Sequence, residues 1–260
     1  MQARCLLLLA VLVVRQTVMT ALLYREWLRF IRQPVRILAV IAVPLMFWLV
    51  VGAGFGSSFA AADGARYDTF VLPGAGLLGV LFSAIFSTIS VIEDRESGFL
   101  QGVLVAPHGR RAFVAAKLCS GVVFASGQAA VVWAFARVPA AHWPGLLLAT
   151  AAVAGGLVGL GFLVARVKQS VAAYHSAMNS LFMPLWALSG ALFPVDSAAP
   201  WLRWVMRVNP LTYGLQWMRE AAAGRSVDPR AMLLTSGVAL VLCALALLIA
   251  DRDARPRVNA

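Results

Sequence analysis

A glycine motif is the first candidate in this chain for binding a ligand. Gly74-Ala75-Gly76-Leu77-Leu78-Gly79 has the GxGxxG spacing with which dinucleotide-binding proteins bring backbone close to a pyrophosphate. That chemistry needs a strand before the motif and a βαβ unit around it. Here Pro73 precedes the motif and an uncharged apolar run surrounds it. We therefore expect these glycines, and the GxxxG pair Gly155/Gly159, to mark close contacts between helices.

The other candidates for catalysis are scattered. His108, His142 and His175 lie far apart, and only His175 falls inside an apolar run. The chain contains no GxSxG, HExxH, CxxC or GxxxxGK[ST] sequence, so no metal site, cofactor site or ATP-binding P-loop is predicted in it. A lipid-modifying enzyme or an assembly scaffold stays a second interpretation. The few polar side chains that the apolar runs offer to a site are Ser83, Ser87, Thr88, Ser90, Gln128, Asn179 and Ser180.

The elements that position these residues are predicted to be membrane spans. Of the 260 residues, 61% are hydrophobic and 13% are charged, which is far more apolar than a soluble domain. The net charge of +11 is assigned to loops on the cytoplasmic side, and no nucleic acid partner is expected. Crossing a bilayer takes about 20 apolar residues. The expected fold is an all-α integral membrane protein with six transmembrane helices at about 37–59, 71–92, 115–136, 143–165, 171–193 and 231–250.

The distribution of basic residues predicts that both termini are cytoplasmic. In that orientation 15 of the 22 Lys and Arg lie in inside segments and 7 lie outside. Residues 1–18 are either a real extension or the product of a mis-assigned start, with Met19 as the initiator. The membrane domain is expected over 19–250, followed by a cytoplasmic tail over 251–260.

An amphipathic helix is predicted over residues 20–33, before the first span. Its apolar face carries Trp27 and Phe30, and its basic face carries Arg25, Arg29 and Arg32. Such a helix lies in the membrane interface, and Pro34 ends it.

Two connecting segments also carry helical patterns. Glu93–Pro107 combines an acidic start with an apolar-periodic stretch, which predicts a short cytoplasmic helix that docks a partner. Pro194–Arg230 contains Trp201, Trp204, Tyr213 and Trp217 and the turn signal Asn209-Pro210, which predict a helical hairpin at the outer leaflet.

The energy for any transport is expected to come from another protein. Ion-coupled transporters carry acids or bases within their spans, and the charge-free runs, the third beginning at Leu118, contain none. An ion-coupled antiporter is therefore an alternative to a transporter that is driven through the segment Glu93–Pro107.

Two segments resemble the type-2 ABC exporter permeases, and most closely the branch that exports daunorubicin or nodulation-factor lipooligosaccharides. Ile85–Pro107 (IFSTISVIEDRESGFLQGVLVAP) is similar to their span-two end and coupling segment. Leu188–Arg219 (LSGALFPVDSAAPWLRWVMRVNPLTYGLQWMR) is similar to their second signature. The similarity covers about Met19 to Ala250.

The resemblance implies a division of labour between subunits. Two permease copies, or one copy and a close paralogue, each engage a separate ATPase subunit that binds ATP and Mg²⁺. The protein would sit in a bacterial inner membrane and export an amphiphilic drug, a polyketide or a lipid-linked saccharide.

The resemblance also implies roles for individual residues. Gln101 stands where many members carry a glutamate. The ATPase-coupling residues would be Glu93, Asp94, Arg95, Glu96, Gly98, Leu100, Gln101 and Pro107. The substrate path would be lined by Ser83, Ser87, Thr88, Asn179, Phe182 and Met183. The external gate would include Pro194, Trp201, Asn209, Pro210, Tyr213 and Arg219.

Overall fold

The computed structural model describes residues 18–55, 67–105 and 109–252, and every regular element in these ranges is helical. The all-α prediction is therefore confirmed for the described residues. Five helices are long and apolar enough to cross a membrane. They are α2 (Pro34–Phe55), α3 (Tyr67–Glu96), α5 (Gly109–Phe135), α6 (Trp143–Val167) and α10 (Pro229–Arg252).

The remaining helices are shorter. A helix over residues 18–31 precedes α2, and Pro34 is the first residue of α2, where a proline is readily accommodated. The shorter elements are α4 (Phe99–Val105), α7 (Val171–Ala187), α8 (Pro200–Val208), α9 (Pro210–Ala222) and the 3₁₀ turns Ala140–His142 and Val195–Ser197.

The expected fifth span is shorter than predicted. α7 has 17 residues and ends at Ala187. The prediction that this helix continues over 188–193 is therefore wrong. The chain turns there because Gly190 adopts φ +86°, a left-handed conformation that glycine takes without a steric penalty. Seventeen residues are the lower limit for a span, and a sixth crossing by α7 stays a prediction.

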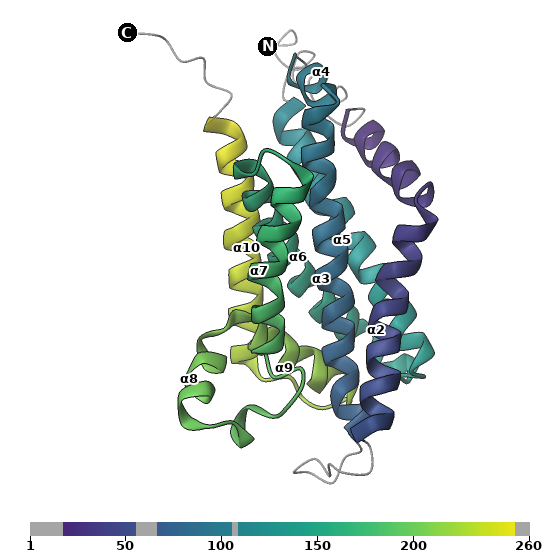
Figure 1. Ribbon diagram of the computed structural model, residues 1–260, viewed down its shortest axis with the longest axis vertical. Coiled ribbons are helices and arrows are strands. Elements are labelled where there is room, and N and C mark those ends of the chain that lie inside the picture. Colours follow the sequence, from purple (N-terminus) through teal and green to yellow (C-terminus); the bar gives the residue numbers. More distant parts are fainter. Residues whose placement is uncertain (1–17, 56–66, 106–108, 253–260) are drawn as a thin grey trace, which may run out of the picture.

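The helices form an elongated bundle around α3, which contacts α2, α5, α6 and α7 and is buried over most of its length (Figure 1). α10 packs against α6, α9 and α5. The helix over 18–31 and α4 lie at one end of the bundle, here called the α4 end, and α8 and α9 lie at the other, the α9 end (Figure 1). Each end of the bundle is therefore covered by its own pair of short helices.

The glycines of the GxGxxG motif lie where α3 touches its neighbours. A Cβ on Gly74 would lie 2.8 Å from the carbonyl oxygen of Ala191, and a Cβ on Gly76 would overlap the ring of Trp133 in α5. Gly159 meets α10 in the same way, with Cys243 N 3.1 Å from the Cβ position. These contacts confirm that the glycines allow close helix packing.

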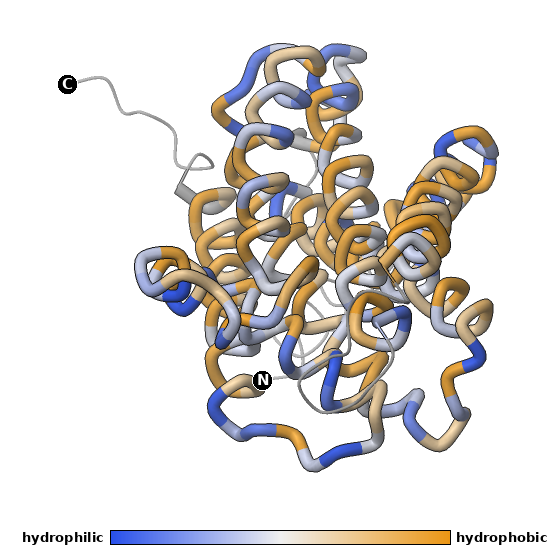
Figure 2. Tube along the Cα trace, turned by 60° about the horizontal axis from the view of Figure 1, so that its bottom comes forward, coloured by the Kyte–Doolittle hydropathy of each residue, from blue (hydrophilic) through white to orange (hydrophobic). Residues whose placement is uncertain are grey.

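Apolar side chains also cover the outside of the bundle. Figure 2 shows hydrophobic residues along most of the length of the helices. On α2 and α10 large side chains such as Met46, Val50, Leu240 and Leu248 are exposed. Because no described part of the chain covers them, these faces are suited to contact with lipid.

Candidate functional site

Seven charged side chains meet at the α4 end, and we call this group the charge cluster. Hydrogen bonds and ion pairs join the helix over 18–31 to the last turn of α3, to α5 and to the first turn of α2. Its members are Arg25, Glu26, Arg29, Arg36, Glu93, Asp94 and Lys117.

Lys117 lies at the centre of the charge cluster. Its side chain is 2% exposed, and its ammonium group has three N–H donors. Nζ lies 2.8 Å from Glu26 Oε1, 2.7 Å from Asp94 Oδ2 and 2.7 Å from Ser90 Oγ. Each donor therefore has one partner, which is the condition under which a buried ammonium is tolerated.

Asp94 is the main acceptor of the charge cluster, and its side chain is fully buried. Arg25 Nη2 donates to Oδ1 at 2.7 Å and Arg29 Nη1 donates to the same oxygen at 2.9 Å, while Lys117 lies on Oδ2. Glu93 accepts from Arg29 at 2.6 Å. The basic face of the helix over 18–31 therefore contacts α3.

This arrangement corrects two sequence-based expectations. Lys117 was counted among the basic residues of a cytoplasmic segment, but its side chain is buried two turns inside α5. Asp94 was placed on a docking surface, whereas it is covered by the chain's own arginines and lysine. The acidic start of the segment thus serves an internal contact.

The predicted short helix of the coupling segment is present as α4. α3 ends at Glu96, and Gly98 makes the turn with φ +74°, a glycine conformation typical of a helix C-terminus. The Gly98 amide donates to the Arg95 carbonyl at 3.2 Å. Arg95 itself donates to the carbonyls of Ala165 and Lys168, which fixes the end of α3 to the end of α6.

Only part of α4 is available to a partner. Phe99, Leu100 and Val103 are half-buried against the core, and the Arg25 guanidinium lies 3.6 Å from the centre of the Phe99 ring. The apolar stretch of this segment was expected to dock a partner, whereas these three side chains pack against the core of their own chain. The exposed residues at the corner are Glu96, Ser97, Gln101 and Gly102. Pro107 lies outside the described residues.

The helix over 18–31 presents mixed faces. Phe30 stacks on Phe124 of α5, with 4.2 Å between ring centres. Trp27 is 49% exposed and Ile31 52% exposed, one turn apart, while Arg32 is also exposed. Trp27 and Ile31 therefore form an apolar strip that the described residues leave uncovered.

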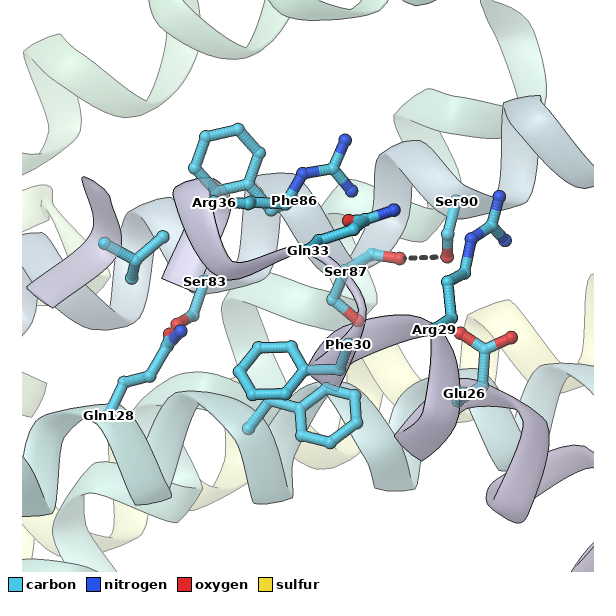
Figure 3. Close-up of a pocket in the computed structure, with 12 residues that line it drawn as sticks. Glu26, Arg29, Phe30, Gln33, Arg36, Ser83, Phe86, Ser87, Ser90 and Gln128 are labelled. Carbon is cyan, nitrogen blue, oxygen red and sulfur yellow. Dashed lines mark hydrogen bonds between the residues drawn. The ribbon is translucent and has the colours of Figure 1, made fainter. Parts of the chain in front are cut away.

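A small polar pocket lies beside the charge cluster, between the helix over 18–31, α2, α3 and α5 (Figure 3). Ser83 Oγ and Gln128 Oε1 line it, and neither buried oxygen has a hydrogen-bond partner among the described residues. Its volume of about 40 Å³ has room for a few water molecules. A drug-sized ligand needs several times that space, so this pocket is no cargo site.

The six residues assigned to the substrate path do not share one face. Phe182 is fully buried, and Thr88, 1% exposed, is hydrogen-bonded to Tyr174 and to the Ala84 carbonyl. Asn179 lies on the exposed side of α7, while Ser87 and Met183 are half-buried. Ser83 lines the small pocket. Thr88 and Phe182 therefore pack inside the chain.

The Asn-Pro-Leu-Thr-Tyr motif forms the corner between α8 and α9. Asn209 Oδ1 accepts from the Leu211 amide at 3.0 Å, and its Nδ2 donates to the Leu185 carbonyl of α7 at 2.6 Å. Thr212 Oγ1 donates to the Met206 carbonyl, and Tyr213 OH donates to the Arg207 carbonyl. The predicted pair of short helices is confirmed, and the motif's polar side chains hold its corner.

The other residues assigned to the gate lie around this corner. Pro194 precedes the turn at Val195–Ser197, and Pro210 is the first residue of α9. Arg219 donates to the Gly190 carbonyl at 3.0 Å and lies 4.1 Å from the centre of the Phe70 ring. Trp201 on α8 is 70% exposed, so it lies apart from the buried face of α9.

Comparison with known proteins identifies the chain. The family model "ABC-2 type transporter" matches residues 17–222. The chain belongs to this family. The matched region includes the charge cluster, α4 and the Asn209 corner.

Three relatives are identical to this chain at about a quarter of the aligned positions. Nodulation protein J of Rhizobium leguminosarum bv. viciae is 26% identical over 205 residues, 74% of this chain and 76% of that protein. The daunorubicin resistance ABC transporter permease protein DrrB1 of Streptomyces coeruleorubidus is 25% identical over 248 residues. These residues are 88% of this chain and 80% of that protein. The probable multidrug ABC transporter permease YbhR of Escherichia coli K12 is 27% identical over 154 residues, 56% of this chain, which spans only 42% of YbhR.

Proposed function

We propose that this chain is the transmembrane permease subunit of an ATP-driven ABC exporter. Two copies, or one copy and a close paralogue, form the membrane unit, and each engages a separate ATPase subunit that binds ATP and Mg²⁺. The observation that carries the proposal is the family match over residues 17–222, which includes the α3–α4 corner.

In this proposal α4 is the coupling helix. Glu96 and Gln101 are exposed at the α3–α4 corner, and their side chains make no hydrogen bond or ion pair within the described part of the chain, so they are available to the ATPase. The charge cluster lies directly behind them. It joins the last turn of α3 to the helix over 18–31 and to α5, so a push on α4 is transmitted to three helices together.

The cargo path is proposed on the side of α3 and α7 that this chain leaves partly open. Phe86 of α3 and His175 of α7 make an edge-to-face contact at 6.2 Å, with Ser87, Asn179 and Met183 nearby on the same two helices. An aromatic surface with a few polar groups suits an amphiphile. The relatives named for multidrug transport and daunorubicin resistance support a drug or polyketide, and Nodulation protein J supports a lipid-linked saccharide.

The proposed orientation places the α4 end and both termini on the cytoplasmic side of a bacterial inner membrane. It can be tested by labelling single cysteines in a variant without the native ones. Gln101→Cys in α4 should react with a membrane-impermeant maleimide only after the cells are opened. Trp201→Cys in α8 should react in intact cells. The reverse pattern would contradict the orientation and the coupling role with it.

Docking of the ATPase is tested by charge reversal at Glu96. Glu96→Arg should reduce the amount of ATPase that co-purifies with the chain and leave its thermal unfolding unchanged, because Glu96 supports no internal contact among the described residues. Asp196→Arg is the matched control, since Asp196 is 91% exposed at the α9 end. Equal ATPase recovery with Glu96→Arg and with the control would remove Glu96 from the interface.

A further inference from the structure

A second, larger cavity opens at the α4 end on the side away from the charge cluster. It lies between α3, α4, α5, α6 and α10 and has a volume of about 300 Å³. Its lining residues are Val91, Arg95, Leu100, Arg110, Phe113, Val114, Phe162, Arg166, Ile249 and Ala250.

The polar side chains of this lining are three arginines, and the described residues that form it include no acid. The Arg95 guanidinium donates hydrogen bonds to two backbone carbonyls. Among the described residues no carboxylate pairs with its positive charge. Arg110 is half-buried, and its side chain makes no hydrogen bond or ion pair within the described ranges. Arg95 and Arg110 therefore bring to the cavity positive charge that no carboxylate of the described residues pairs with.

The rest of the cavity is apolar. Phe113, Val114 and Phe162 are each at most 7% exposed, so they form a fixed apolar wall beneath the arginines. Ile249 and Ala250 bring the end of α10 to the rim, and Leu245 and Leu248, at 41% and 58% exposed, continue the apolar surface along α10. A ligand that fits must have an anionic head and a long apolar part.

We propose that this cavity binds the phosphate headgroup of an anionic phospholipid, with its acyl chains lying along the exposed face of α10. Guanidinium groups bind phosphate oxygens through paired N–H donors, and basic pockets between transmembrane helices at the cytoplasmic side are suited to such headgroups. A free phosphate would meet the same arginines but would leave the apolar wall unused. The proposal requires the bundle to lie in a membrane and is independent of ATP-driven transport.

The experiment is native mass spectrometry of the purified full-length chain, titrated in detergent with phosphatidylglycerol or with phosphatidylcholine of the same acyl chains. Phosphatidylglycerol should bind at least tenfold more tightly. Arg110→Gln should weaken phosphatidylglycerol binding about fivefold, the effect expected for one basic residue near a membrane surface. Arg110→Lys, which keeps the charge, should recover most of that loss.

Two further variants make the result specific to the cavity. Ala250→Phe fills the rim without changing the charge and should also weaken phosphatidylglycerol binding. Arg137→Gln removes an exposed arginine at the α9 end and should have no effect. Equal binding of the two lipids, or an equal loss with Arg137→Gln, would overturn the proposal. Displacement of the lipid by millimolar inorganic phosphate would overturn it in favour of a soluble anion.

Discussion

Lys117 Nζ lies 2.7 Å from Asp94 Oδ2, in the middle of a cluster that joins four helices at one end of the bundle. Both side chains are shielded from solvent by this chain alone. Asp94 lies in the last turn of α3, two residues before that helix ends at Glu96, and Lys117 belongs to α5. The pair therefore fixes the position from which α4, the proposed coupling helix, projects.

Replacing Lys117 should destabilise the protein. Lys117→Met removes three hydrogen bonds and leaves the buried carboxylates of Asp94 and Glu26 with less compensation. Breaking a buried ion pair costs about 3 kcal/mol or more. The measurement is thermal unfolding in detergent. Lys168→Met is the matched control, because the Lys168 side chain has no ion pair among the described residues, and an equal loss in both variants would contradict the role of Lys117.

Gly98→Ala should disturb the direction of α4. A left-handed conformation costs a residue with a Cβ about 1 kcal/mol, and relief of that strain turns α4 relative to α3. We expect ATPase co-purification to fall about fivefold with little change in membrane insertion. Gly102→Ala tests the same substitution in α4 where a Cβ meets nothing within 4 Å, and it should retain the ATPase. Full ATPase recovery with Gly98→Ala would mean that the corner tolerates strain.

The sequence predicted the short helices at both ends of the bundle better than it predicted how they pack. α4 and the Asn209 corner follow from local signals, which are apolar periodicity after a glycine and an Asn-Pro dipeptide between two amphipathic stretches. The end of α7 was missed because the apolar run continues past Ala187, and hydropathy does not register the turn at Gly190.

The charge cluster was missed for a different reason. Lys117 and Glu26 are 91 residues apart in the sequence, and no periodic pattern connects them. Two local signals were present: Glu26 is an acid within a basic helix, and Lys117 stands immediately before the uncharged run of α5. The buried faces of α3 and α7 were likewise unpredictable, because Thr88 and Phe182 are buried by neighbours that only the tertiary structure supplies.

Asn209→Ala should loosen the corner at the α9 end. It removes the N-cap of α9 and leaves the Leu185 carbonyl without its donor. We expect a loss of about 2 kcal/mol in the free energy of unfolding, from the cap and the unpaired carbonyl together. Unfolding in a denaturant series would measure it. Asn179→Ala, at an exposed position of α7, should change stability little, and comparable losses for the two variants would refute the structural role of the motif.

Gly76→Ala should separate α3 from α5. The added methyl group would overlap the Trp133 ring, whose position is fixed because it is fully buried. Overpacking of this kind costs about 2 kcal/mol. Gly127→Ala on α5 places the same methyl group where nothing lies within 4 Å. Thermal unfolding should distinguish the two variants. A Gly76→Ala protein as stable as the Gly127→Ala protein would show that α3 and α5 do not need the close contact at Gly76.

The central claim is that this chain moves cargo only with the power of a separate ATPase. The direct measurement is export of a fluorescent amphiphile into proteoliposomes that contain the chain alone, or the chain with the ABC ATPase that co-purifies from its native membranes. We predict ATP-dependent transport with both subunits, and neither transport nor ATP hydrolysis with the chain alone. ATP hydrolysis by the pure chain, or transport driven by a proton gradient without ATP, would contradict the account.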